Sequence, residues 1–98
     1  MRLRYHVGSV MEVYTLNNLK VQFGRQIRSL RLGKHLTQEQ LAEVAGISVD
    51  FLSLIERGRN APSFSSIQKL ARALGVPVKA LFDFEQDAPD SEAASFVS

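Results

Sequence analysis

The sequence predicts an all-α fold made of five helices. Between Asn18 and Phe82, apolar residues return every three or four positions, which is the period of an α-helix. Helix-capping residues and glycines separate these apolar stretches into short segments. The 98 residues, 45% apolar and 22% charged, match one small globular domain. No apolar run approaches the roughly 18 residues that a membrane span needs, so we expect no membrane insertion.

The first helix is expected to begin at Asn18 and to stop at Gly33, a residue that often ends helices. Most of the basic side chains of this stretch fall outside its apolar face. That face consists of Leu19, Phe23, Ile27 and Leu30.

The second helix has a clear start signal. Thr37 and Gln40 form a capping-box pattern, in which each side chain binds a backbone N–H of the other residue. We therefore expect a helix over 38–45 that ends at Gly46. Its buried residues are predicted to be Leu41, Ala42 and Ala45.

The other three helices follow from similar signals. Ser48 is expected to cap a third helix of about 49–57, and Ser63 a fourth. Pro77 suits the first turn of a short fifth helix that reaches about Phe82. The glycines expected at the ends of the third and fourth helices are Gly58 and Gly75.

The chain divides into three parts. Residues 18–84 form the predicted helical domain, including its C-terminal segment. Residues 1–17 are expected to be an extended or disordered arm, because Gly8 and Ser9 interrupt residues that favour strands. Residues 85–98 are small, polar and acidic, and we expect a disordered tail.

Charge is distributed unevenly along the chain. Residues 19–82 carry ten basic and four acidic side chains, whereas residues 83–98 carry five acidic side chains and no basic one. A basic body with an acidic tail suits a protein that binds a polyanion, although a solvated surface is the plainer interpretation.

The sequence offers little for catalysis or metal binding. It contains no cysteine, and His6 and His35 are too far apart for a metal motif. No catalytic constellation accompanies His35, so we expect no enzyme activity, no cofactor, no metal and no small-molecule substrate. The absence of cysteine fits the reducing cytoplasm.

The spacing across residues 38–57 is more specific than the general helical pattern. Two short helices are joined by Gly46, Ile47 and Ser48, and this short turn is typical of a helix-turn-helix. The small Ala42 lies where the helices should cross, which allows a close approach. The second helix of such a pair can enter the major groove of DNA.

Residues from about Phe23 to Phe82 resemble the XRE family of helix-turn-helix regulators, the phage-repressor and Cro type. The match includes the flanking first, fourth and fifth helices in the right order. The resemblance therefore implies a phage-repressor-like DNA-binding domain of five helices. The matching stretches are FGRQIR (23–28), LTQEQLA (36–42), LSLIERGRN (52–60) and LARALGV (70–76).

The resemblance also implies roles for individual residues. The third helix would be the recognition helix, and its base-reading positions are Val49, Asp50, Ser53 and Leu54. The positions implied to contact DNA phosphates are Gln38, Phe51, Arg57, Arg59 and Asn60. Arg31 and Glu56 match a structural ion pair between the first and third helices.

Several of these residues have a simpler interpretation. Gln38 could only start a helix, Arg59 and Asn60 could be solvated loop residues, and Phe51 could pack against the core. Asp50 could accept a hydrogen bond from cytosine, or it could stabilise the helix N-terminus with its negative charge.

The chain departs from the family pattern at three positions. Val49 and Leu54 are apolar where many relatives carry glutamine or another long polar side chain, so direct base reading is expected to be sparse. His35 stands where relatives often have glycine, which predicts a left-handed histidine backbone.

A core of about 60 residues is marginal alone, which favours a homodimer. The apolar residues expected to face the partner subunit are Val78, Phe82 and Phe84. The sequence thus predicts a cytoplasmic, homodimeric repressor or autoregulator that binds a palindromic operator in double-stranded DNA. The alternative is a protein-interaction module, for example an antitoxin-like subunit, that keeps this fold with weak or no DNA binding of its own.

Overall fold

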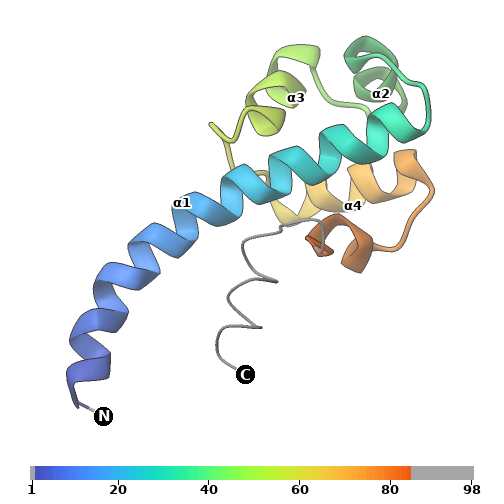
Figure 1. The fold of residues 1–98 in the computed structure, drawn as a ribbon. Coiled ribbons are helices and arrows are strands. Elements are labelled where there is room, and N and C mark those ends of the chain that lie inside the picture. Colours follow the sequence, from blue (N-terminus) through green and yellow to red (C-terminus); the bar gives the residue numbers. More distant parts are fainter. Residues whose placement is uncertain (1, 85–98) are drawn as a thin grey trace.

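The computed structural model of the chain describes residues 2–84, with side chains from residue 18 onward. Within this range every regular element is helical, which confirms the all-α class (Figure 1). The elements in chain order are α1 (Arg2–Gly33), α2 (Gln38–Ala45), α3 (Val49–Glu56), α4 (Phe64–Leu74) and the 3₁₀ helix η1 (Val78–Phe82).

The described residues contain four α-helices instead of the five that the sequence predicts. The predicted fifth helix lies in the expected place but is the 3₁₀ helix η1. Its backbone bonds join Ala80 N to Pro77 O at 2.9 Å and Asp83 N to Ala80 O at 3.4 Å. Each bond spans three residues, and such a short segment commonly adopts the tighter 3₁₀ form.

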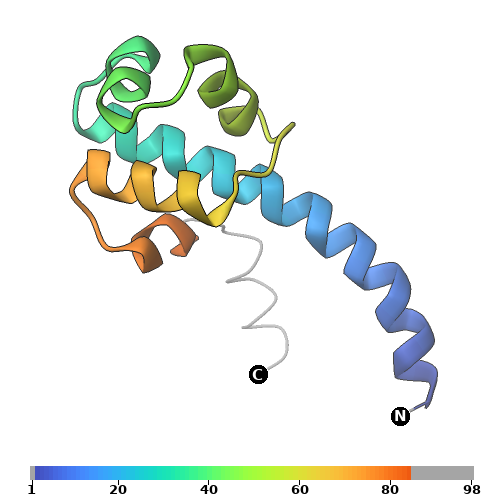
Figure 2. The same ribbon diagram turned by 180° about the vertical axis from the view of Figure 1, so that it is seen from behind.

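The N-terminal arm also differs from the prediction. Residues 2–17 are helical and continue α1, whereas the sequence predicts an extended or disordered arm over 1–17. Figures 1 and 2 show this part of α1 projecting from the rest of the fold. Adding a residue to an existing helix avoids the cost of nucleation, so glycine and β-branched residues only weaken the extension. Met1 and the predicted tail at 85–98 lie outside the described residues.

The predicted capping residues fix the starts of the three short α-helices. Gln40 N donates to Thr37 Oγ1 at 3.0 Å, and Thr37 N donates to Gln40 Oε1 at 2.8 Å, so the capping box is complete. Ser48 and Ser63 accept bonds from the first turns of α3 and α4. The bounds of α2 therefore match the prediction of 38–45.

Left-handed residues then turn the chain out of its helices. Gly46 has φ 78° at the end of α2, a conformation that glycine adopts at low cost. His35 has φ 60°, which confirms its predicted left-handed backbone after α1. Gly33, the expected stop, is the last residue of α1.

The hydrophobic core lies between α1 and the layer formed by the shorter helices (Figure 2). The predicted inward residues Leu41, Ala42 and Ala45 are buried there, and Leu81 joins them from η1. Leu19 is 37% exposed, so the buried face of α1 begins later than predicted. The buried cluster consists of Phe23, Ile27, Leu41, Ala42, Ala45, Leu52, Ile55, Leu70, Ala71, Leu74 and Leu81.

None of the described helices combines the length and the apolar character that crossing a membrane requires.

Candidate nucleic-acid interface

Hydrogen bonds fix both ends of the turn that joins α2 to α3. Gly46 N donates to Ala42 O at 2.9 Å, and Phe51 N donates to the Ser48 hydroxyl at 3.0 Å. α3 then buries Leu52 and Ile55. Because these anchors lie on one face, the opposite face of α3 is turned away from the core.

The four predicted base-reading residues on α3 differ in how far they are exposed to solvent. Asp50 is exposed, while Ser53 and Leu54 are half-buried. Val49 is also half-buried, and it packs against the hydrophobic core. Part of Val49 is therefore occupied in holding the helix.

The predicted phosphate-contacting residues form a partly exposed group at the end of α3 and in the following loop. Arg57 and Arg59 are exposed, and Asn60 is half-buried. Arg57 Nε donates to Ser53 O at 3.3 Å, which ties the start of the guanidinium group to α3. Phe51 is half-buried and packs against the core, as the simpler interpretation of this residue expects.

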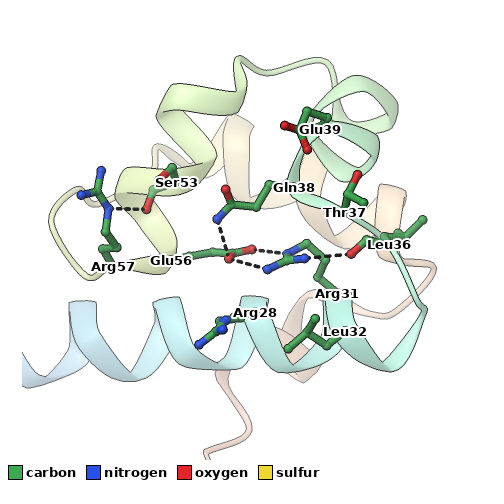
Figure 3. Close-up of a pocket in the computed structure, with 10 residues that line it drawn as sticks. All are labelled: Arg28, Arg31, Leu32, Leu36, Thr37, Gln38, Glu39, Ser53, Glu56 and Arg57. Atoms are coloured by element: carbon green, nitrogen blue, oxygen red, sulfur yellow. Dashed lines mark hydrogen bonds and ion pairs between the residues drawn. The ribbon is translucent and has the colours of Figure 1, made fainter.

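The predicted ion pair between α1 and α3 is present. Arg31 Nε lies 2.8 Å from Glu56 Oε2, and Arg31 Nη2 donates to Glu56 Oε1 at 3.1 Å, so the contact is bidentate (Figure 3). The two side chains are only 9% and 2% exposed. Arg31 Nη1 also donates to Leu36 O at 2.8 Å, which satisfies a third nitrogen of the buried cation.

Gln38 belongs to the same network. Its Nε2 donates to Glu56 Oε1 at 3.0 Å, so the side chain bridges the start of α2 to the end of α3 (Figure 3). Gln38 therefore does more than start a helix, because a buried carboxylate fixes where its amide lies.

A cleft of about 590 Å³ opens beside this network. Arg28 of α1 and Arg57 both line the cleft, together with the ion pair and Gln38 (Figure 3). The sequence interpretation missed Arg28. The available signal was its position three residues before Arg31, because residues three apart lie on the same side of a helix.

The predicted dimerisation residues lie around η1. Val78 and Phe82 are 43% and 39% exposed, whereas Phe84 is half-buried and packs against the core. The Phe82 ring lies between the rings of Phe23 and Phe84, with centroid distances of 5.0 Å and 6.2 Å. The two neighbouring rings thus hold Phe82 in place, while part of its side chain stays exposed to solvent.

An apolar groove of about 230 Å³ runs beside Phe82. Leu19 and Phe64 line it from α1 and α4, and Phe64 is 88% exposed. Phe64 also escaped the sequence interpretation, because an apolar residue at a helix start gives no sign of facing outward.

No group of three or more histidine or acidic side chains that could hold a metal ion occurs in the part of the chain that the structure describes. The polar groups around the cleft include the guanidinium groups of Arg28 and Arg57 and the amide of Gln38.

Comparison with known proteins identifies similar sequences and structures. A family model described as helix-turn-helix matches residues 27–81. Control protein C.BamHI of Bacillus amyloliquefaciens is 41% identical over 69 residues, which cover 69% of this chain and 85% of that protein. The immunity repressor protein of Bacillus phage phi105 is 40% identical over 70 residues, which cover 71% of this chain but only 49% of the repressor.

A solved structure shares this fold. The restriction-modification controller protein C.AhdI from Aeromonas hydrophila matches with a TM-score of 0.64 and 40% sequence identity. The match covers 64% of this chain and 96% of the controller protein. The region of similarity thus spans nearly the whole of that protein.

Proposed function

This chain belongs to the XRE type of the helix-turn-helix family, and from that membership we propose that it is a DNA-binding regulator of transcription. The observation that carries the proposal is the α2–turn–α3 unit, in which caps and buried residues hold α3 with one face outward. An α-helix presented in this way fits the major groove of DNA.

In this proposal α3 is the recognition helix. Asp50, Ser53 and Leu54 would contact base edges, and the exposed part of Val49 would offer apolar contact only. Few hydrogen-bonding groups are available for this purpose, so DNA shape should contribute much of the specificity.

The phosphate contacts would supply most of the affinity. Arg57, Arg59 and Asn60 follow α3 in the chain, and Gln38 begins α2. Phe51 could add only a backbone or ring-edge contact, since it packs inward. Such contacts set the register of the protein on DNA without reading the sequence.

We propose further that the protein acts in the cytoplasm as a homodimeric repressor or autoregulator on a palindromic operator. The partly exposed Val78 and Phe82 support the dimer, and Phe82 lines the apolar groove and contacts the ring of Phe84. Two-fold symmetry would place the recognition helices on half-sites about 34 Å apart. No catalytic activity forms part of this function.

One observation favours a second function. The half-buried Val49 and Leu54 make the outward face of α3 more apolar than base reading requires. A protein-interaction module with little DNA binding of its own would also use such a face.

The dependence of DNA binding on salt distinguishes these functions. We expect Arg59→Ala to weaken binding to every duplex and to make the slope of log K against log salt shallower by about 0.9, the value for one lost phosphate contact. Arg72→Ala is the matched control, because Arg72 is also exposed but lies on α4. Equal slopes for the two variants would remove Arg59 from the interface, and an absence of binding by the unmodified protein would favour the interaction module.

A further inference from the structure

We propose that Arg28 of α1 binds a backbone phosphate of DNA in the cleft beside the Arg31–Glu56 ion pair, together with Arg57 and Gln38. The inference rests on the proposed function and adds to it a contact from α1, an element outside the helix-turn-helix. The cleft lies where α1, the start of α2 and the end of α3 meet (Figure 3).

The charges in the cleft favour an anion. The buried Arg31 and Glu56 neutralise each other through two hydrogen bonds. Arg28 and Arg57 are exposed, and the structure records no carboxylate partner for either among residues 18–84. Glu39 also lines the cleft, but it lies beyond Thr37, away from both arginines (Figure 3). The end with the arginines is therefore a cationic site.

Gln38 supplies a neutral donor that is already oriented. A side-chain amide nitrogen carries two hydrogens, and the bond from Gln38 Nε2 to Glu56 Oε1 uses one of them. The other hydrogen remains for a second acceptor. Because Arg31 holds Glu56 through two hydrogen bonds, the carboxylate already fixes the Gln38 amide before a ligand binds.

A phosphodiester matches this set of donors. It carries one negative charge, and its oxygens accept hydrogen bonds from guanidinium and amide groups at once. The cleft is open and has a volume of about 590 Å³, so a phosphate can enter while still joined to its neighbouring sugars. A DNA strand passing α2 and Arg57 would thereby also touch α1.

The test compares Arg28→Ala with Arg25→Ala, each measured on a duplex of about 25 base pairs at four salt concentrations. Arg25 is exposed on the same helix but does not line the cleft, so both variants lose the same charge. We expect Arg28→Ala to weaken binding about tenfold, as for one lost charged hydrogen bond. Its salt slope should become shallower by about 0.9 while that of Arg25→Ala changes little. Arg28→Lys should restore the slope.

Equal affinities and slopes for Arg28→Ala and Arg25→Ala would overturn the inference. That result would leave the proposed function intact as long as Arg59→Ala still made the slope shallower. A folded protein that binds no duplex at all would instead overturn the proposed function. Thermal unfolding of each variant checks folding, and we expect unchanged midpoints because both arginines are exposed.

Discussion

Gly24 is the residue that lets α1 lie directly against the end of α3. A β-carbon at this position would lie 2.3 Å from Ile55 O and 2.8 Å from Glu56 O, both closer than real β-carbons approach backbone oxygen. The same close approach brings Glu56 within reach of Arg31, and through Glu56 it fixes Gln38. The absence of a side chain at Gly24 therefore allows the polar network beside the proposed DNA-binding face to form.

We expect Gly24→Ala to lower the free energy of unfolding by about 3 kcal/mol, at the upper end of the cost of overpacking, because the obstructing atoms belong to the backbone. Gly33→Ala is the control within the same helix. It has no atom within 4 Å of an added β-carbon, so its stability should be unchanged or raised by about 0.5 kcal/mol. Urea unfolding measures both. A Gly24→Ala protein as stable as the unmodified one would show that the two helices are not so tightly joined.

At the scale of elements, α2 and α3 are the parts most fully determined by local sequence. Their capping residues, Thr37 and Ser48, are within three residues of the groups that they bind, so a pattern along the chain was sufficient to locate both helix starts. The ion pair between Arg31 and Glu56 was available only through the family resemblance, since 25 residues separate the partners.

Features that depend on tertiary packing could not be predicted from the sequence. The 3₁₀ form of η1 and the length of α1 differ from the prediction, because helix type and extension reflect small energy differences. The exposure of Phe64 and the place of Arg28 beside the cleft depend on how helices pack. The periodicity of α4 does not distinguish Phe64 from its neighbours, and the sequence signal for Arg28 is only its position three residues before Arg31.

The role of α3 leads to a prediction about specificity. We expect Ser53→Ala and Leu54→Ala to change which bases are preferred at one or two positions of a selected motif, because both side chains are partly exposed on the proposed recognition helix. A lost contact of this kind costs about 1–3 kcal/mol of discrimination. Ser65→Ala, an exposed serine on α4, is the control and should leave the motif unchanged. The same motif from all three variants would contradict the assignment of the recognition face.

At the scale of the whole molecule, the domain presents two surfaces with different chemistry. Arginine and amide groups gather where α1, α2 and α3 meet, whereas apolar side chains gather near η1 and the start of α4. A two-fold dimer through the apolar surface would leave the polar surface of each copy free for DNA. Such a dimer would also add buried area to a small core.

We expect Val78→Glu to convert the proposed dimer into a monomer, because it would bring two like charges together at a two-fold contact. Val78 is 43% exposed and lies outside the buried cluster, so the substitution should leave the fold intact. Val44→Glu is the control, since Val44 is 65% exposed on α2, away from η1. Sedimentation equilibrium should give the dimer mass for Val44→Glu and half of it for Val78→Glu. A dimer mass for both would place the interface elsewhere.

Selection of binding sites from a random duplex pool is the most direct test of the central claim, that this chain is a dimeric, sequence-specific DNA-binding regulator. We expect an enriched palindromic motif whose half-sites are centred about one helical turn apart, roughly 34 Å. Binding to this motif should persist at a salt concentration that abolishes binding to random DNA. A pool that yields no motif, or only salt-sensitive binding without sequence preference, would contradict the account.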